Sequence, residues 1–313
     1  CGEPGSGVRG ASYNCLIMRA WPLAYEEPVF RPPSEAGSLI LQVTVGCSHN
    51  RCTFCPSFKG KRFRIKSLDE IVEDLEYASR RFRRVDRLFL CDGDALIIPQ
   101  QRLIAILDAI RTHLPGVGRI GTYANAKSIR KKSVEELSEL RERGLGIVYL
   151  GIESGNEEVL ARIRKGATCE QIVEAARRVK EAGITLSVTV LLGIGGVAMS
   201  AAHARDTARI LTDVDPDFAG VLTVMLAPGT ALHEEARSGA FVLPGTFALL
   251  EELGIIVSGA RFSNCFFTAN HASNYLPIRA RMPRDREKVL RLIDDVVRRS
   301  DASLLRPESM RGL

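Results

Sequence analysis

Short apolar segments rich in β-branched residues alternate with segments of helical periodicity between residues 39 and 226. The apolar segments span 39–45, 86–91, 118–123, 146–152, 184–192 and 218–226, and the helical patterns span 67–83, 100–113, 133–143, 168–182 and 200–213. This alternation predicts an α/β fold in which a parallel sheet is covered by helices. The βα units can form an incomplete barrel or an open doubly wound sheet. In both arrangements the loops after the carboxyl ends of the strands form the ligand site.

The pattern changes at both ends of the alternating region. Residues 1–36 are rich in glycine, proline and small side chains and are expected to form an N-terminal extension. Residues 37–236 are expected to form the core, and residues 237–313 a mainly helical C-terminal cap that contributes to the substrate region. Between two helical patterns in the cap, the segment 261–277 (RFSNCFFTANHASNYLP) has loop-like composition. We expect it to be either a lid over the site or a hydrogen-bonded structural loop.

Composition and charge favour a folded protein without a membrane segment. Hydrophobic residues make up 45% of the 313 residues, and the net charge of +6 comes from 43 basic and 37 acidic side chains scattered along the chain. This distribution is weak support for nucleic-acid binding. No apolar run approaches the roughly 20 residues that span a bilayer, and no signal peptide is visible, so a cytoplasmic location is expected. Eight cysteines in a chain of this length fit reduced thiols.

Three of these cysteines lie close together after the first predicted strand. Cys47, Cys52 and Cys55 form a C-x4-C-x2-C pattern. Three thiolates from one loop can hold three irons of a four-iron cluster and leave the fourth iron open to another ligand. A structural zinc site normally needs four protein ligands. His49 is a possible fourth ligand, but we expect it to face solvent or to bond the loop backbone.

With Phe54 directly before its last cysteine, this loop resembles the cluster loop of the radical S-adenosylmethionine (radical SAM) superfamily. Its spacing differs from the usual C-x3-C-x2-C of that family. The stretch CDGDALIIP at 91–99 resembles the family's motif for the methionine amino group, with Asp92, Gly93 and Asp94 at the matching positions. A turn with incidental acidic residues is the alternative for this stretch.

Later strand ends extend the resemblance. The stretch GIESGN at 151–156 is similar to a subgroup that includes methylthiotransferases and the oxygen-independent coproporphyrinogen oxidase-like oxidoreductases, which implies cofactor contacts for Glu153 and Ser154. A helix cap is the alternative role of Ser154. The glycines of VTVLLGIGG resemble the family's adenine-binding strand end, at Gly193, Ile194 and Gly195. His203 in the following segment is expected to be a surface histidine.

The resemblance, which covers about residues 38–236, implies a partial TIM-like (β/α)6 barrel and an enzyme with a 4Fe-4S cluster and S-adenosyl-L-methionine as cofactors. Such an enzyme reductively cleaves S-adenosylmethionine to a 5'-deoxyadenosyl radical, which abstracts hydrogen from a substrate. We expect a small-molecule substrate and an electron donor such as flavodoxin or ferredoxin, and we expect neither nucleic acid nor membrane as a partner. No second cysteine cluster or N-terminal cobalamin-sized domain is visible, so methylthiotransferase and cobalamin-dependent methylase activities are not expected. The alternatives are an RNA-modifying radical SAM enzyme and a non-catalytic iron-sulfur or zinc protein.

Overall fold

The structure, a computed structural model, describes residues 25–312 of the chain. The predicted N-terminal extension enters this range only from residue 25, and Cys1 and Cys15 lie outside it. The six cysteines within the described range are all free thiols. In the same range, no helix combines the length and the apolar character that a membrane span requires.

An eight-stranded sheet forms the centre of the molecule, with strand order β1-β4-β5-β6-β7-β8-β9-β10. Its neighbours pair in parallel from β1 to β9, and β10 is antiparallel to β9. The strands are β1 (Leu39–Gln42), β4 (Arg87–Cys91), β5 (Arg119–Ala124), β6 (Leu145–Glu153), β7 (Thr185–Leu192), β8 (Phe218–Thr223), β9 (Cys265–Thr268) and β10 (Arg279–Met282). A separate two-stranded sheet pairs β2 (Thr44–Val45) with β3 (Arg64–Ile65). The sheet does not close, which confirms the predicted partial barrel.

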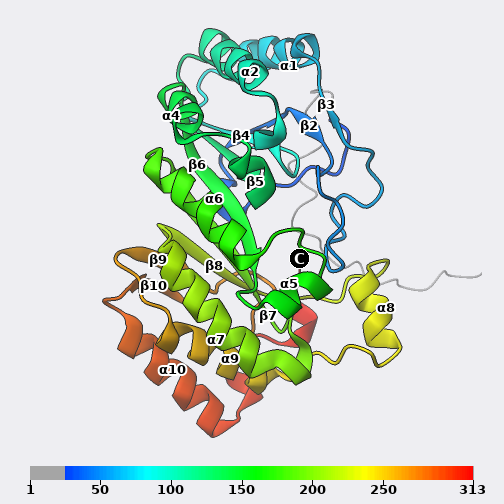
Figure 1. The fold of residues 1–313 in the computed structure, drawn as a ribbon, viewed down its shortest axis with the longest axis vertical. Coiled ribbons are helices and arrows are strands. Elements are labelled where there is room, and N and C mark those ends of the chain that lie inside the picture. Colours follow the sequence, from blue (N-terminus) through cyan, green and yellow to red (C-terminus); the bar gives the residue numbers. More distant parts are fainter. Residues whose placement is uncertain (1–24, 313) are drawn as a thin grey trace, which may run out of the picture.

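The helices are α1 (Leu68–Arg81), α2 (Gln100–His113), α3 (Ala126–Arg130), α4 (Val134–Glu142), α5 (Glu157–Arg162), α6 (Cys169–Glu181), α7 (Gly196–Val214), α8 (Ala231–Arg237), α9 (Thr246–Gly259) and α10 (Arg286–Arg299). Most of them lie around the outer side of the sheet, and α8 lies apart from it (Figure 1). Short 3-10 helices are η2 (Pro33–Glu35), η3 (Ala95–Ile97), η4 (Ala302–Leu304) and η5 (Glu308–Met310). Capping boxes begin α1 at Ser67 and α4 at Ser133, because each serine accepts from a backbone N–H three residues on and that residue's carboxylate bonds back.

The two faces of the sheet are packed differently. The outer face and the helices form the main apolar core, to which Leu88, Val148 and Phe267 contribute. The inner, concave face holds a smaller cluster that includes Phe89 and Tyr149. Strand residues alternate between the two faces, so each strand sends one set of side chains towards the helices and the other set into the concave side.

The C-terminal region adds two strands that were not predicted. The segment 261–277, expected to be a loop, contains β9, and the following residues form β10. Beyond β9, Ser273 Oγ accepts from Thr223 N–H at 3.1 Å, and the Asn274 side chain bonds Thr223 Oγ1 and Val221 O at 2.8 and 2.7 Å. Ser273 and Asn274 are buried. The segment is therefore a hydrogen-bonded part of the structure, as the second alternative expected, and its role as a lid over the site stays a prediction.

Candidate functional site

The loop that connects β2 to β3 carries the three clustered cysteines at the carboxyl end of the sheet. Gly46 has a φ of 73°, which turns the chain directly before Cys47. Lys59 Nζ then donates to the carbonyls of Asn50 at 3.1 Å and Cys52 at 3.0 Å, so the far side of the loop is bonded to the part between the first two cysteines. Hereafter, "cluster loop" means residues 46–63.

The cluster-loop thiols lie close enough to act on one another electrostatically. Burial raises the pKa of Cys47, while the backbone N–H groups of Asn50 and His49 act in the opposite direction. Burial likewise raises the pKa of Cys52 to about 11, opposed by the Lys165 charge, and Cys55 and Cys47 raise it further. The N–H groups and the ammonium favour the thiolate, which is the form that ligates metal.

A four-iron cluster fits this donor set. Within residues 25–312, no three His, Cys, Asp or Glu side chains converge so closely that they could hold a single metal ion. Each cysteine of a cluster ligates a different iron, so cluster ligands are more widely spread than the ligands of one zinc ion. Cys47, Cys52 and Cys55 are each partly exposed, with N–H donors and a lysine beside them. Three partly exposed thiols on one loop are thus the donor set that a four-iron cluster with one open iron needs.

Gly93, after β4, lies directly against the cluster loop. A Cβ at this position would lie 2.8 Å from Cys47 Cβ and 2.9 Å from Phe58 Cε2, distances that real Cβ atoms do not tolerate. Gly93 N–H also donates to Gly46 O at 3.1 Å. The glycine thus allows the chain after β4 to approach the first cysteine closely.

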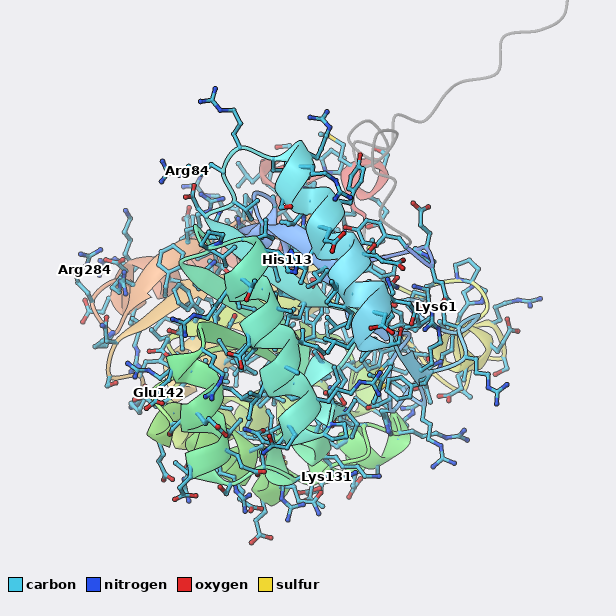
Figure 2. The ribbon with its side chains drawn as sticks, turned by 90° about the horizontal axis from the view of Figure 1, so that it is seen from above. Lys61, Arg84, His113, Lys131, Glu142 and Arg284 are labelled. Atoms are coloured by element: carbon cyan, nitrogen blue, oxygen red, sulfur yellow. The ribbon has the colours of Figure 1, made fainter. Side chains whose placement is uncertain are left out.

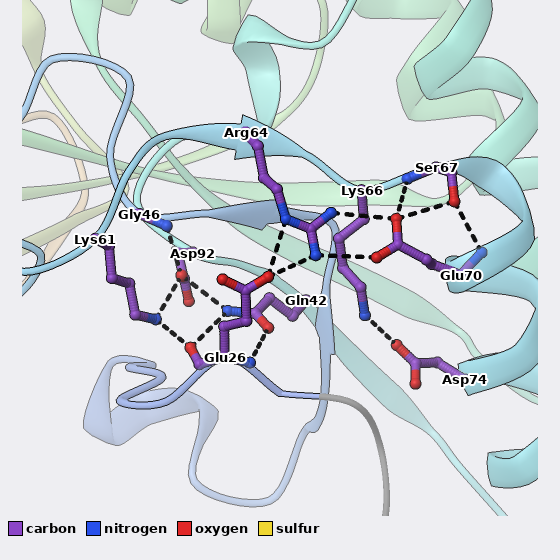
Figure 3. A network of polar contacts seen from close by, with 10 residues as sticks. All are labelled: Glu26, Gln42, Gly46, Lys61, Arg64, Lys66, Ser67, Glu70, Asp74 and Asp92. Atoms are coloured by element: carbon purple, nitrogen blue, oxygen red, sulfur yellow. Dashed lines mark hydrogen bonds and ion pairs between the residues drawn. The ribbon is translucent and has the colours of Figure 1, made fainter.

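Asp92 is buried behind the cluster loop and anchors it (Figure 3). Its Oδ2 accepts from Gly46 N–H at 2.8 Å, from Gln42 Nε2 at 2.9 Å and from Lys61 Nζ at 2.9 Å. Lys61 also bonds the Pro28 carbonyl at 2.6 Å, which ties the N-terminal extension to the loop. Asp92 Oδ1 is buried without a hydrogen-bond partner in the described part of the chain. Only this oxygen of Asp92 is left for the predicted cofactor contact.

Figure 3 also shows the acidic partners of two other basic residues of the segment 59–66. Arg64 Nη2 pairs with Glu26 Oε1 at 2.5 Å and with Glu70 Oε1 at 2.9 Å. Lys66 Nζ pairs with Asp74 Oδ2 at 2.7 Å, and both side chains are buried. Much of the positive charge near the cluster loop is therefore paired with acidic side chains, at the surface for Arg64 and in the interior for Lys66.

Asp94 connects the cluster loop to the carboxyl end of β5. Its Oδ2 accepts from Ser48 Oγ at 2.5 Å and from Asn125 Nδ2 at 2.6 Å, and its Oδ1 accepts from Ser128 Oγ at 2.6 Å. Burial raises the pKa of Asp94 to about 6, although these hydrogen bonds act to lower it. Asn125 and Ser128 were not predicted as site residues. Their position directly after the third predicted strand is the signal that identifies them.

Glu153 ends β6 with a φ of 67°, at an irregularity in the pairing with β7. Its Oε1 accepts from Lys165 Nζ at 2.8 Å, and both side chains are mostly buried. The charges of Lys165 and Glu153 both affect the pKa of the Cys52 thiol, so this ion pair lies beside the cluster loop. Lys165 was missed as a site residue, although the Lys-Gly turn after GIESGN was visible in the sequence.

Ser154 points away from this ion pair. His203 Nε2 donates to Leu191 O at 3.1 Å, so Nδ1 is left as the acceptor for Ser154 Oγ at 2.8 Å. Ser154 Oγ in turn accepts from Asn156 N–H, and Asn156, rather than Ser154, caps α5. His203 is fully buried, and burial lowers its pKa to about 4. The expectation of a surface histidine was wrong, because this neutral imidazole bonds two strand ends.

The glycine-rich end of β7 is covered by the C-terminal region. A Cβ at Gly193 would lie 2.8 Å from Leu249 Cδ2 and 2.9 Å from Leu243 Cδ1. Gly193 N–H donates to Glu252 Oε2 at 2.7 Å, and burial raises the pKa of Glu252 to about 7. Ile194 is buried in the core, and Gly195 stands at the start of α7. The adenine contact of these three residues stays a prediction.

His49 bonds the backbone of the turn after α5, and not that of its own loop as expected. Its Nε2 donates to Arg164 O at 2.7 Å, and its ring lies against Gly166, where a Cβ would be 2.4 Å from His49 Cε1. Burial is the largest cause that lowers the pKa of His49. The histidine thus joins the cluster loop to the turn that carries Lys165. In total, the structure brings together the cysteines, Gly93, Asp94 and Glu153. Ser154 bonds His203 and Ile194 is buried, and the cofactor contacts of both stay predictions.

Curated relatives of the chain include two proteins whose names indicate different functions. An uncharacterised methyltransferase of Pyrococcus horikoshii is 26% identical over 206 residues, which cover 65% of this chain and 43% of that protein. A tRNA-2-methylthio-N(6)-dimethylallyladenosine synthase of Dehalococcoides mccartyi is 27% identical over 205 residues, which cover 64% of this chain and 48% of that protein. The chain thus spans less than half the length of these relatives.

Solved structures show the same fold. The radical S-adenosylmethionine methyltransferase TsrM of Kitasatospora setae aligns with a TM-score of 0.53 at 21% identity, over 66% of this chain and 41% of that chain. Methylornithine synthase (PylB) aligns with a TM-score of 0.51 at 18% identity, over 72% and 63% of the two chains. The family model of the radical SAM superfamily matches residues 41–206, more than half of the chain. The protein therefore belongs to the radical SAM superfamily.

Proposed function

We propose that the protein binds a 4Fe-4S cluster through Cys47, Cys52 and Cys55 and uses S-adenosylmethionine to abstract hydrogen from a small-molecule substrate. The observation that carries this proposal is the position of the cluster loop. It lies at the carboxyl end of the sheet, packed on Gly93, with the Glu153–Lys165 pair beside Cys52. Family membership makes the protein an enzyme and gives it the cofactors of the radical SAM superfamily.

The chemistry supplied by the bound cofactors is one-electron cleavage of S-adenosylmethionine to a 5'-deoxyadenosyl radical that abstracts a hydrogen atom. The chain's own residues would position the cofactors and polarise the cysteine thiols. The N–H groups of His49 and Asn50 and the Lys165 ammonium favour the thiolates. Glu153 offers its Oε2 as an acceptor for an ammonium or hydroxyl group, since Lys165 takes Oε1.

Iron content tests the cluster assignment. Anaerobically purified and reconstituted protein should hold about four irons per chain. Cys47→Ala, Cys52→Ala and Cys55→Ala should each lose most of this iron. Cys169→Ala is the matched control, because that thiol is half-buried and donates to Gly155 O at 3.0 Å on the outer side of the barrel. Equal iron loss in the control and the three variants would contradict the assignment.

An RNA substrate is the second candidate, favoured by the names of relatives such as the tRNA-2-methylthio-N(6)-dimethylallyladenosine synthase. The ion pairs of Lys61, Arg64 and Lys66 speak against it, because each of these basic side chains is already paired with a carboxylate of the protein. RNA binding through several phosphates would fall by orders of magnitude between about 50 and 200 mM salt. Tight, salt-sensitive tRNA binding that Lys59→Ala and Arg62→Ala weaken would favour the RNA function over the small-molecule one.

An electron donor such as flavodoxin or ferredoxin and a cytoplasmic location complete the proposal. The free thiols of the described residues support a reducing compartment.

A further inference from the structure

Among residues 25–312, the concave face of the sheet is covered over β5 and β6 and carries partly exposed side chains from β7 to β10. Over β5 and β6, the N-terminal extension covers it, because Glu35 Oε1 accepts from Tyr149 OH at 2.7 Å and from Arg119 Nη2 at 2.6 Å. From β7 to β10, buried and partly exposed residues alternate along the strands, and the partly exposed set lies on the concave face. We call this half of the concave face, formed by the four strands β7 to β10, the trough.

One row of the trough leads from the ion pair at the cluster loop to the edge strand. A Cβ at Gly151 would lie 2.2 Å from Glu153 Oε1 and 2.9 Å from Lys165 Nζ, so the ion pair covers this end. From Gly151 the register runs, strand by strand, through Thr189, Gly220 and Thr268 to Arg279. Four strand spacings correspond to about 19 Å along the sheet. Between the ion pair and the arginine the row consists of small residues, each of them partly exposed.

The far end of this row carries two exposed arginines, Arg279 and Arg281, on the same face of β10. Asn270 Oδ1, in the orientation that satisfies its amide, accepts from Arg279 Nε at 3.0 Å and Nη2 at 2.9 Å. Arg281 stacks on Phe266, with 5.5 Å from Cζ to the ring centroid, and donates to Asn264 Oδ1 at 3.3 Å. Both guanidinium groups are therefore held in place by neutral partners.

The two guanidinium charges have no carboxylate partner within residues 25–312. Their neighbours along the chain differ: Arg284 Nε pairs with Asp285 Oδ1 at 2.9 Å, and Arg291 and Arg298 of α10 pair with acids of their own helix. Arg284 lies on the opposite side of the molecule from Lys61, the residue that anchors the cluster loop (Figure 2). A fixed, uncompensated guanidinium pair is the arrangement that binds carboxylate or phosphate groups.

From this geometry we infer that Arg279 and Arg281 bind an anionic group, a carboxylate or a phosphate, of the enzyme's substrate. The inference rests on the proposed function, since it takes the trough beside the cluster loop as the substrate site. The anionic group binds at the β10 edge, and the remainder of the substrate extends over Thr268 and Gly220 towards Glu153. The substrate is thus an elongated anion whose reacting carbon is remote from its charge.

The test uses inorganic phosphate and acetate as probes, titrated at constant ionic strength into the full chain. Arginine Nε–Hε signals in ¹⁵N–¹H spectra report on the guanidinium groups. The wild type should show saturable shifts with at least one probe below about 50 mM, and Arg279→Gln and Arg281→Gln should weaken that affinity at least about tenfold. Arg291→Gln, an exposed arginine of α10, is the matched control and should bind as the wild type does. Saturation with phosphate alone identifies a phosphorylated substrate, and saturation with acetate a carboxylate.

No saturation with either probe, or equal affinity in the wild type and both variants, would overturn the inference. Steeply salt-dependent binding of a single-stranded RNA that both variants abolish would overturn the small-molecule assignment. Formation of 5'-deoxyadenosine by the wild-type protein, measured on the same preparation, reports on the proposed function separately. Phosphate binding at the arginines without 5'-deoxyadenosine would refute the proposed function and leave the anion site standing.

Discussion

Gly93→Ala should destabilise the protein and displace the first cluster cysteine. The added Cβ would lie 2.8 Å from Cys47 Cβ, 2.9 Å from Phe58 Cε2 and 3.2 Å from Cys47 Cα. Carbon atoms in contact normally stand about 3.5–4.0 Å apart, so the cluster loop has to move by several tenths of an ångström. Insertion of a methyl group into such a packed contact costs about 1–3 kcal/mol of unfolding free energy.

Two measurements check this prediction. Urea denaturation of the iron-free protein gives the loss of unfolding free energy, and iron per chain after anaerobic reconstitution shows whether Cys47 still ligates. Gly60→Ala is the control on the same loop, because a Cβ there meets nothing within 4 Å. Its unfolding free energy should change by less than about 0.5 kcal/mol. If Gly93→Ala matches Gly60→Ala in both measurements, the close packing of the cluster loop on Gly93 is refuted.

Three further predictions concern the surroundings of the site. Glu153→Gln should keep the cluster but weaken S-adenosylmethionine binding about tenfold, a loss of roughly 1.4 kcal/mol. Ser154→Ala should leave that affinity unchanged because Ser154 bonds His203, and equal affinities of Glu153→Gln and the wild type in equilibrium binding would remove Glu153 from the site. The folded-state pKa of His203, about 4, lies below its unfolded value, so the unfolded state binds more protons and stability falls as pH falls towards 4. Between pH 7 and pH 5 the wild type should lose about 2 kcal/mol more unfolding free energy than His203→Gln, and parallel pH profiles would contradict this. Arg306 Nη1 donates to the carbonyls of His271, Ala272 and Asn274. Arg306→Ala should therefore cost about 2–3 kcal/mol of unfolding free energy and speed hydrogen exchange in residues 270–276, and unchanged protection there would show that other contacts hold this loop.

The sequence predicted the strands and helices of the core well, because each βα unit has its own hydrophobic period. The predicted strand 118–123 is observed as β5 (Arg119–Ala124), and the predicted helix 100–113 as α2. β9 and β10 were missed because they are four residues long and lie between loop-like residues. Their alternation of buried and exposed residues becomes visible only when the neighbouring strand is known.

The site was only partly predictable, for a related reason. Cys47, Cys52 and Cys55 are neighbours in the sequence, and their spacing alone indicates a metal centre. The partners of Asp94 and Ser154 come from other strand ends and from α7, at separations of 31 to 49 residues. No local pattern shows that Ser154 bonds a buried histidine.

Formation of 5'-deoxyadenosine tests the central claim most directly. Reconstituted protein is incubated anaerobically with S-adenosylmethionine and dithionite, and the product is quantified by liquid chromatography. The wild type and Cys169→Ala should form 5'-deoxyadenosine even without substrate, and Cys47→Ala, Cys52→Ala and Cys55→Ala should form none. No product from iron-loaded wild type, or equal product from the three cysteine variants, would contradict the claim that these cysteines hold the cluster that cleaves S-adenosylmethionine.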